Sequence, residues 1–342
     1  MAAAERHDDI CDVAGILVGS DTRLDVGTGC TVVLPQWPAL GAVDVRGGAP
    51  ATRETDLLSP LCFMREVHAV LLTGGSAFGL AAADGIMRAL AVRGTGYDTG
   101  LARVPIVPAA ALFDLGLGRA DVWPDAAAGA RALEAAAAGP VAQGTVGAGT
   151  GATVGKLGGP ALMVKGGLGS ASATLPDGHT IGALVAVNAA GDVYAPETGR
   201  IVAGARSPSG RGWLAAQPPA GRPPAPDTWP EAPAPGTNTT LAVIATDAPW
   251  DKAELAKLAQ MAHDGLALAI RPVHTPLDGD VVFALSTARD LPAPAQPGWQ
   301  LALALAGALA AQTLARAVVK AVRAATGLHD VPAAGELPFT GA

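Results

Sequence analysis

The sequence has few aromatic residues, few charges and only three cysteines. Aromatic side chains make up 4% of the 342 residues and charged side chains 15%, whereas hydrophobic residues make up 50%. A close-packed core must therefore be built from small aliphatic side chains. The net charge is −7 and the Lys and Arg residues are scattered. There is no basic stripe for nucleic acid and no polybasic patch for a membrane surface, so neither partner is expected.

The cysteines, Cys11, Cys30 and Cys62, are odd in number and form no CxxC pair. This pattern excludes a disulfide framework and a zinc knuckle, and it favours buried free thiols in a reducing compartment. The six histidines show no HExxH motif and no close pairing, and we expect each to be structural or solvated. We predict no metal.

Long apolar runs are also missing. The longest, residues 301–311, is about half of a membrane span. The first residues, MAAAERHDDICD, are polar and acidic and lack the apolar segment of a signal peptide. The sequence therefore predicts a cytoplasmic location.

What the sequence does contain is an alternation of strand and helix patterns, which predicts an α/β fold. Short apolar or alternating runs predict strands at 10–18, 30–34, 42–45, 69–72, 171–175, 181–188, 241–245 and 281–285. Helical periodicity predicts helices at 81–93, 125–138, 252–267 and 299–325. Between them, residues 206–238 are rich in proline and have no periodicity, as in a long loop or linker. Because strands and helices lie on both sides of this linker, we expect residues 1–342 to form one domain from two pieces.

The glycine-rich run GTVGAGTGATVGKLGG, within residues 144–169, invites comparison with nucleotide-binding loops. It lacks the spacing of a phosphate loop, and no convincing helix pattern follows it. We interpret it as a tight backbone crossing or a loop that lines a substrate site. No organic cofactor is predicted.

The junction between Asn238 and Thr239 is where the proline-rich loop ends and a β-branched, apolar segment begins. One interpretation is an ordinary loop that leads into a strand. The other is that the chain is cut there and Thr239 becomes a new N-terminus. An N-terminal threonine carries its own base, because an α-amine has a pKa of about 7.7–8.0. The Thr239 hydroxyl would attack the Asn238 carbonyl, and water would hydrolyse the resulting ester.

A pair of carboxylates, Asp278 and Asp280, precedes the strand predicted at 281–285. Residues two apart in an extended segment point to the same face, so the two carboxylates would lie side by side. Such a pair can hold an ammonium group, and the charge of one member can raise the pKa of the other, which suits it to shuttle protons. A solvated turn is the alternative.

Several stretches together resemble a known family. They are LLTGGSAFGLAAADGI, RVPIVPAAALFDLGLG, GTVGAGTGATVGK, KGGLGSAS, IGALVAVNAAGDV, NTTLAVIATDA and HTPLDGDVVFALST, and they span about residues 14 to 325 in order. The sequence resembles the self-processing N-terminal-nucleophile aminopeptidases, which include the L-aminopeptidase/D-alanyl-esterase, the β-aminopeptidases and the nylon-oligomer hydrolases. Some members have a Gly-Ser junction and paired glutamates. The Asn-Thr junction and paired aspartates of this chain are most similar to the nylon-oligomer branch, the 6-aminohexanoate-oligomer endohydrolases.

The resemblance implies a four-layer αββα sandwich of N-terminal-nucleophile type. It implies a precursor cut into an α piece, residues 1–238 with a processing linker at 206–238, and a β piece, residues 239–342. The two pieces would stay together and form a homotetramer of αβ units, with no metal or cofactor. Substrates would be small linear amides or peptides.

The resemblance also implies residue roles. Thr239 is the nucleophile and Asn238 precedes the cut. Asp278 and Asp280 position the α-amine and manage protons.

Asn188, in VAVNAAGD, would donate a hydrogen bond to the tetrahedral oxyanion, and losing such a donor costs about 3–4 kcal/mol of barrier. Lys165, in KGGLGSAS, would supply positive charge near the nucleophile. Lys156 is the alternative lysine, since it lies nearby in the sequence.

Three functions remain open at this stage. The first is a threonine amidohydrolase that acts on peptides, β-peptides or 6-aminohexanoate oligomers through an acyl-enzyme. The second is an acyl transferase similar to ornithine acetyltransferases, which share the nucleophile architecture. The third is a non-enzymatic protein in which the junction is only a loop.

Overall fold

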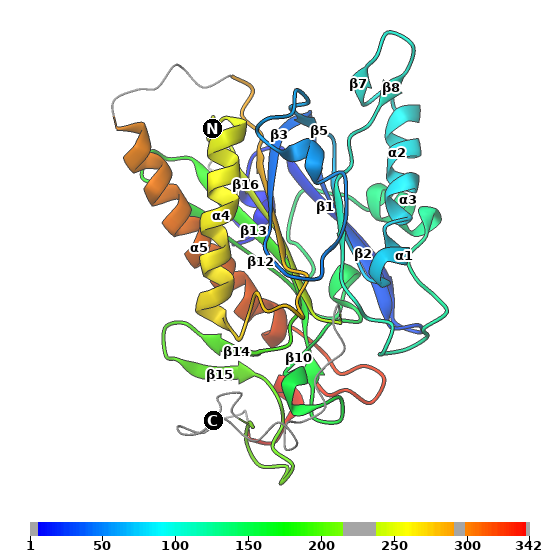
Figure 1. The fold of residues 1–342 in the computed structure, drawn as a ribbon, viewed down its shortest axis with the longest axis vertical. Helices are drawn as coiled ribbons and strands as arrows, with labels where there is room; N and C mark the ends of the chain where they lie inside the picture. Colours follow the sequence, from blue (N-terminus) through cyan, green and yellow to red (C-terminus); the bar gives the residue numbers. More distant parts are fainter. Residues whose placement is uncertain (1–5, 215–236, 291–297, 340–342) are drawn as a thin grey trace.

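The protein has four layers in the computed structural model, which describes residues 6–214, 237–290 and 298–339. Two β-sheets face each other in the middle, and helices cover the outer face of each (Figure 1). The predicted αββα sandwich is therefore confirmed. Most of the predicted linker, residues 215–236, lies outside the described residues.

The larger sheet has six strands, and it carries the Asn238–Thr239 junction. Its spatial order is β12 (Gly167–Thr174), β13 (Thr180–Asn188), β16 (Thr239–Thr246), β18 (Val281–Ser286), β3 (Ala39–Val45) and β5 (Glu66–Val67). Strand β16 is antiparallel to β13 and parallel to β18. Residues from both sides of the linker thus share one sheet.

The second sheet has five strands and comes entirely from the chain before the linker. Its order is β1 (Ile16–Arg23), β2 (Thr28–Pro35), β6 (Val70–Thr73), β9 (Ala109–Ala111) and β4 (Ala51–Arg53). Smaller pairings join β10 (Thr153–Val154) to β11 (Val164–Lys165), β7 (Tyr97–Asp98) to β8 (Arg103–Val104), and β14 (Asp192–Ala195) to β15 (Arg200–Ala203) and β17 (Ile270–Arg271).

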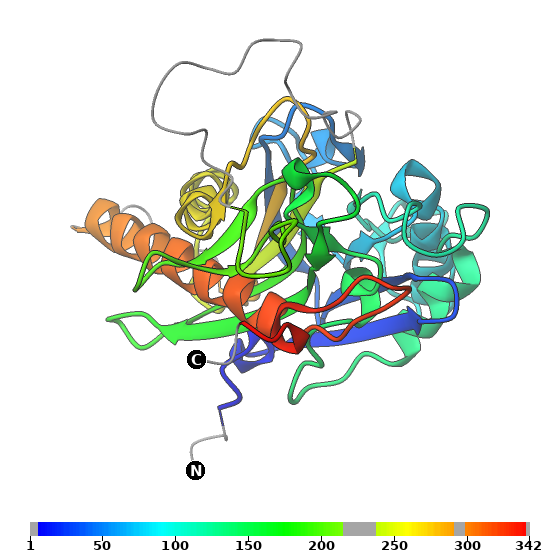
Figure 2. The same cartoon turned by 90° about the horizontal axis from the view of Figure 1, so that it is seen from below.

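The helices form the two outer layers. Helices α4 (Lys252–Ala269) and α5 (Trp299–Arg323) lie side by side on the six-stranded sheet, while α2 (Ala82–Val92) and α3 (Ala126–Glu134) cover the other sheet (Figures 1 and 2). A short helix, α1 (Ser76–Gly79), precedes α2. Helix α5 is long and apolar enough to span a membrane by length and composition, but 61% of its apolar window is buried inside the protein. Its packing against β12 and β13 makes it a core helix.

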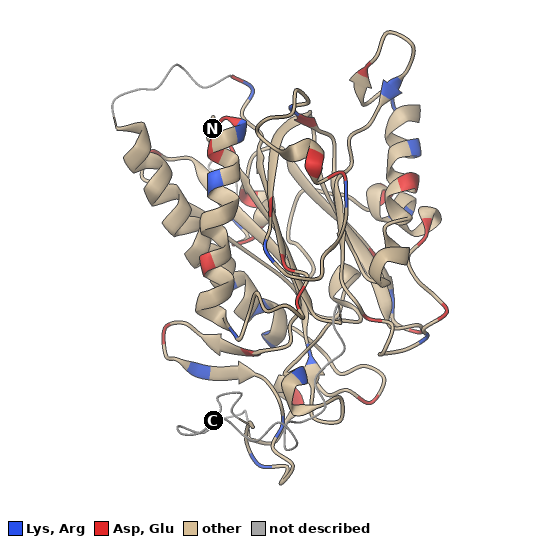
Figure 3. Cartoon of the chain, in the orientation of Figure 1, with Lys and Arg blue, Asp and Glu red and all other residues tan. Residues whose placement is uncertain are grey.

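Strand alternation explains how the six-stranded sheet contributes side chains to two layers of the core. In β16, Leu241 and Val243 belong to the cluster between the sheets, whereas Ala242 and Ile244 belong to the cluster under α4 and α5. Successive side chains of a strand point to opposite faces, so Thr239 shares the inter-sheet side with Leu241. Charged residues are scattered over the helices and loops, without a concentration of one sign (Figure 3).

Three sequence predictions need correction. Residues 10–18 form a 3₁₀ turn (Ile10–Asp12) and only then β1, because the Asp9 carboxylate accepts the Cys11 N–H and starts the turn. Helix α3 ends at Glu134 rather than at 138, since Ala137 pairs with Val18 of β1. The cysteines are free as expected, but only Cys30 is buried.

The glycine-rich run does form a tight crossing. A Cβ on Gly149 would lie 2.2 Å from the backbone nitrogen of Leu168, so only glycine fits there.

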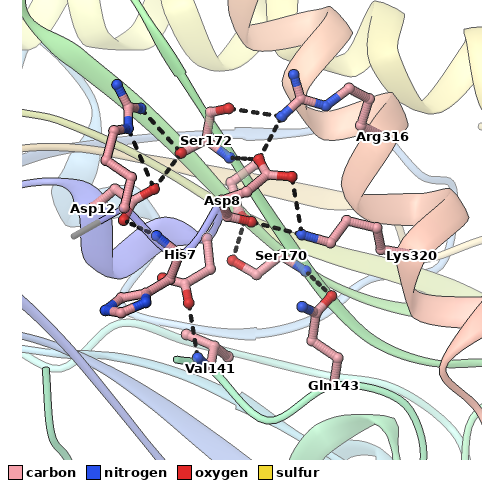
Figure 4. A network of polar contacts seen from close by, with 12 residues as sticks. His7, Asp8, Asp12, Val141, Gln143, Ser170, Ser172, Arg316 and Lys320 are labelled. Atoms are coloured by element: carbon pink, nitrogen blue, oxygen red, sulfur yellow. Dashed lines mark hydrogen bonds and ion pairs between the residues drawn. The ribbon is translucent and has the colours of Figure 1, made fainter. Parts of the chain in front are cut away.

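A cluster of polar side chains ties the start of the chain to β12 and α5. We call it the N-terminal network; Figure 4 shows its main members, which are His7, Asp8, Asp12, Ser170, Ser172, Arg316 and Lys320.

Candidate active site

The junction lies inside the sandwich, where three strands of the large sheet begin or end. Thr239 opens β16 and pairs with Asn188 at the end of β13, and Asn238 pairs with Asp278 just before β18. Asn238, Thr239, Asn188 and Asp278 are each at most 2% exposed. The sheet therefore brings together four of the predicted site residues, which come from three segments far apart in the sequence.

The carbonyl group of Asn238 has two donors. The backbone N–H of Gly279 donates to its oxygen at 2.8 Å, and the Thr239 hydroxyl donates to the same oxygen at 2.5 Å. A Cβ on Gly279 would lie 2.8 Å from Thr239 Oγ1, so the absence of a side chain there leaves room for the hydroxyl. A carbonyl that accepts two hydrogen bonds is polarised toward nucleophilic attack.

The two aspartates lie beside the junction. Asp280 Oδ1 accepts the backbone N–H of Thr240 at 2.7 Å. Asp278 Oδ2 accepts the N–H of Thr275 at 2.9 Å and its hydroxyl at 2.5 Å. Burial, and next to it the charge of Asp280, raises the pKa of Asp278. The charge of Asp280 acts in the direction that the paired carboxylates predict, although burial is the larger cause, and the catalytic role of the pair stays a prediction.

Asn188 is held by hydrogen bonds at both ends of its amide. Its Oδ1 accepts from the backbone N–H of Thr153 at 3.0 Å and from Lys156 Nζ at 2.8 Å. Its Nδ2 donates to the carbonyl oxygens of Phe113 at 2.9 Å and Thr237 at 3.4 Å. The longer of the two donor contacts reaches the residue just before Asn238, so Nδ2 lies beside the junction.

The lysine at the junction is Lys156, not the Lys165 that the resemblance favoured. Lys156 Nζ donates to the Asn188 carbonyl at 3.1 Å and to the Thr237 carbonyl at 2.9 Å, besides Asn188 Oδ1. Lys165 Nζ instead donates to the carbonyls of Thr150 and Ala152, both at 2.7 Å. Gly155 has a φ of +73°, in the left-handed region, and the chain turns there. The backbone N–H of Lys156 then donates to the Ala190 carbonyl, just beyond the end of β13.

Both lysines are buried near a third buried charge, Asp114. Burial lowers the pKa of Lys156 to about 7, and the charges of Asp278 and Asp114 oppose this shift. Burial likewise lowers the pKa of Lys165 to about 7, opposed by Asp114. Burial raises the pKa of Asp114 to about 6. Strongly shifted groups gathered in one place are typical of functional sites.

Sequence reasoning missed three contributors to this place. Asp114, in FDLGLG, accepts the Thr28 hydroxyl and the Gly75 N–H, both at 2.7 Å. Gly279 supplies the N–H described above. His274 Nδ1 lies 2.8 Å from Asp280 Oδ2, although the sequence pattern of the histidines predicts a structural or solvated residue here. His274 stands four residues before Asp278 in the sequence, but this spacing alone does not predict the contact.

We use the name junction site for the residues gathered here, which are Lys156, Asn188, Asn238, Thr239, Asp278 and Asp280. Comparison with known proteins shows which family the chain belongs to. The sequence profile of peptidase family S58 matches residues 8–333. The chain belongs to peptidase family S58. It is thereby an amide-bond hydrolase.

Relatives agree with membership of family S58, and a solved structure agrees with the fold. An uncharacterised aminopeptidase of Mycobacterium tuberculosis is 47% identical over 347 residues, which cover 94% of this chain and 96% of that protein. A 6-aminohexanoate-oligomer endohydrolase of Kocuria is 34% identical over 324 residues, or 91% of this chain and 85% of that protein. The L-aminopeptidase D-Ala-esterase/amidase of Ochrobactrum anthropi, a variant of the N-terminal-nucleophile hydrolase fold, matches with a TM-score of 0.71. The match covers 96% of this chain and 89% of the solved chain. At 21% identity it shows the fold alone.

Proposed function

We propose that this family S58 chain is a self-processing threonine amidohydrolase that cuts itself between Asn238 and Thr239. The observation that carries the proposal is the Asn238 carbonyl, which accepts both the Gly279 N–H and the Thr239 hydroxyl. The nucleophile, the bond to be cut and a backbone donor for the oxyanion thus occupy one buried place.

The self-cleavage step is an exchange of an amide for an ester, followed by hydrolysis. Thr239 Oγ attacks the Asn238 carbonyl carbon, and the Gly279 N–H stabilises the oxyanion that forms. The C–N bond then breaks, and the Thr239 nitrogen takes the proton that the hydroxyl loses. Water hydrolyses the ester, which leaves a carboxylate on Asn238 and a free α-amine on Thr239.

Substrate hydrolysis would reuse the same hydroxyl with a new base. The α-amine of Thr239 accepts the hydroxyl proton while Oγ attacks the substrate carbonyl, and it then gives that proton to the leaving amine. Water attacks the acyl-enzyme and releases the acid. Once residues 237–238 move away, the Asn188 Nδ2 that now faces the Thr237 carbonyl is free to donate to the oxyanion.

For substrates, we propose linear amides of peptide or 6-aminohexanoate type, the two kinds named for the relatives. We further propose that the α and β pieces stay together, because β16 is hydrogen-bonded to β13 on one side and β18 on the other. Assembly into a homotetramer of αβ units is also a proposal, and native mass spectrometry of the cleaved protein tests it.

Two matched variants test the self-cleavage. Thr239→Val and Thr240→Val each replace one hydroxyl by a methyl group at adjacent positions of β16. Thr240 Oγ1 is buried without a hydrogen-bond partner among the described residues, so its loss should be harmless. Thr239→Val should stay at full length and lose hydrolysis by a factor of about 10⁴ or more, as for other nucleophile deletions. Thr240→Val should be cut as the wild type is.

The measurement is the intact mass of the denatured protein, followed by N-terminal sequencing of any fragment. Two species, one beginning Thr-Thr-Leu-Ala-Val, support the proposal. A Thr239→Val protein that is still cut at this bond would overturn the assignment of the nucleophile.

A further inference from the structure

His274 lies against one of the two junction aspartates and uses two donors to bind it. Its Nδ1 lies 2.8 Å from Asp280 Oδ2, and its backbone N–H donates to the same oxygen at 3.0 Å. The other carboxylate oxygen, Oδ1, accepts the N–H of Thr240 at 2.7 Å. The side chain of Asp280 is 1% exposed. Asp280 therefore links His274 directly to the strand that begins with Thr239.

The backbone of His274 is strained in a way that serves this contact. Its φ is +57°, in the left-handed region that is unfavourable for a residue with a side chain. This conformation lets the ring and the backbone N–H of one residue reach the same carboxylate oxygen. Strain of this kind persists where the surrounding structure fixes it, and it is concentrated at functional sites.

On its far side, His274 meets a second histidine, from α4. The rings of His263 and His274 are 4.7 Å apart at an angle of 73°. His263 Nε2 lies 3.1 Å from the Asp44 carbonyl oxygen, so this nitrogen carries the proton and donates it. Burial lowers the pKa of His263 to about 4, so this neighbour stays neutral near pH 7.

Among the described residues, the charged groups on the loop of His274 and behind its histidine neighbour can be named. On its own loop they are Asp280 and, beside that residue, Asp278. Behind the neutral His263, at the end of β3, Asp44 and Arg46 form an ion pair at 2.7 Å. The carboxylate that His274 contacts directly is thus Asp280, and Asp44 is already paired with a cation.

These contacts matter for the amine that self-cleavage would create on Thr239. The amine must be neutral to take the proton of the hydroxyl, but two nearby carboxylates stabilise its ammonium form. A donor on Asp280 draws part of that negative charge away. It also keeps the carboxylate directed at the Thr240 N–H.

We propose that His274 is a positioning residue: it orients Asp280 and limits how strongly this carboxylate holds the Thr239 amine in its protonated form. The inference rests on the proposed function, since the amine exists only after cleavage. His274 acts through Asp280.

Two substitutions separate positioning from a merely structural role. His274→Ala removes the Nδ1 donor, whereas His274→Asn keeps an N–H donor and tolerates the left-handed backbone. His179, which is 38% exposed and lies 3.4 Å from Asp247, provides a matched control in His179→Ala. It forms a histidine–aspartate pair away from the junction.

The readout is the pKa of the Thr239 amine. Trace labelling of the cleaved protein with acetic anhydride between pH 5 and 10, followed by mass spectrometry of the β piece, measures it without a known substrate. His274→Ala should raise this pKa by about one unit, the size expected for loss of a charge-assisted hydrogen bond. His274→Asn and His179→Ala should stay near the wild type.

The opposing results are distinct. Equal amine pKa values in wild type and His274→Ala overturn this inference and leave the proposed function standing. The same holds if both His274 variants fold but stay uncut, because the role is then structural. If the wild type itself stays at full length, both proposals fall together.

Discussion

The hairpin of β12 and β13 carries two polar clusters that use similar side chains in different ways. In the N-terminal network, Asp8 lies 2.6 Å from Arg316 and 3.3 Å from Lys320, and these side chains are 54%, 41% and 31% exposed. In the junction site, Lys156 is 9% exposed and its three hydrogen bonds go to neutral oxygens of Asn188 and Thr237. The charges of the N-terminal network are paired in water, whereas the buried Lys156 ammonium has no carboxylate in contact among the described residues.

The difference separates stabilisation from chemistry. Exposed ion pairs stabilise a fold by about 0–1 kcal/mol each. A buried cation without a contacting anion is costly, and burial accordingly lowers the pKa of Lys156 to about 7. Buried groups with strongly shifted pKa values are concentrated at functional sites.

The largest expected effect comes from removing the unpaired cation. Lys156→Met should slow self-cleavage by about 100-fold or more, because Asn188 and the Thr237 carbonyl lose the donor that fixes them beside the bond to be cut. Lys320→Met removes a lysine of the N-terminal network and should leave cleavage unchanged. Intact mass, followed over time after the denatured precursor is refolded, measures both. Equal cleavage rates in the two variants would remove the distinction between the clusters.

A smaller effect is expected from pH. The three hydrogen bonds of Lys156 Nζ use all three protons of an ammonium group, so the charged form fits the site. Because the pKa of this lysine is lowered to about 7, the charge is present below that pH and is lost as the pH rises through it. Self-cleavage should therefore slow above pH 7. Hydrolysis, which needs the neutral α-amine, should instead fall on the acid side.

This prediction is checked by refolding the precursor at pH 6, 7, 8 and 9 and measuring the cleavage rate at each pH. A rate that keeps rising from pH 7 to 9 would show that the neutral lysine is the active form.

The smallest effect belongs to the N-terminal network. Although burial raises it, hydrogen bonds led by that of Ser172 lower the pKa of Asp12 overall. Asp12→Asn should lower the free energy of unfolding by about 1–2 kcal/mol at pH 7 and leave cleavage unchanged.

The sign of the pH dependence follows from this shift. The folded-state pKa of Asp12 lies below the unfolded value, so its contribution is present at neutral pH and is lost as the pH falls through the folded-state pKa. Urea unfolding should thus separate wild type and Asp12→Asn at pH 7, and the gap should narrow as the pH falls below the unfolded-state pKa of about 3.9. A gap that is as wide in acid would mean that the charge of Asp12 is not what stabilises the network.

Much of the fold could be predicted because its main elements have strong periodicity. The apolar runs of β16 and β18 and the helical patterns of α4 and α5 appear at or near the predicted positions. The errors came where tertiary contacts override local pattern. Residues 135–138 have helical composition, but Ala137 pairs with β1 instead. The small sheet of β14, β15 and β17 has runs too short for a periodic signal.

The site was predictable where it depended on strand ends. Thr239, Asn188 and Asp278 each flank an apolar run, and sheet register brings them together. The lysine was not predictable, because two candidates nine positions apart differ only in how the loop between β10 and β11 turns. The contact of His274 with Asp280 depends on a left-handed backbone, which spacing does not reveal.

The groups around the Asn238 carbonyl come from three different strands or their ends. The donors around the Asn238 carbonyl come from Gly279, next to β18, and from Thr239 on β16, and Asn188 of β13 lies opposite. These groups meet only after strands far apart in the sequence have paired in the right register. A chain that has cut itself would therefore have folded first, so the cut fraction in a crude lysate would report folding yield without purification or a substrate.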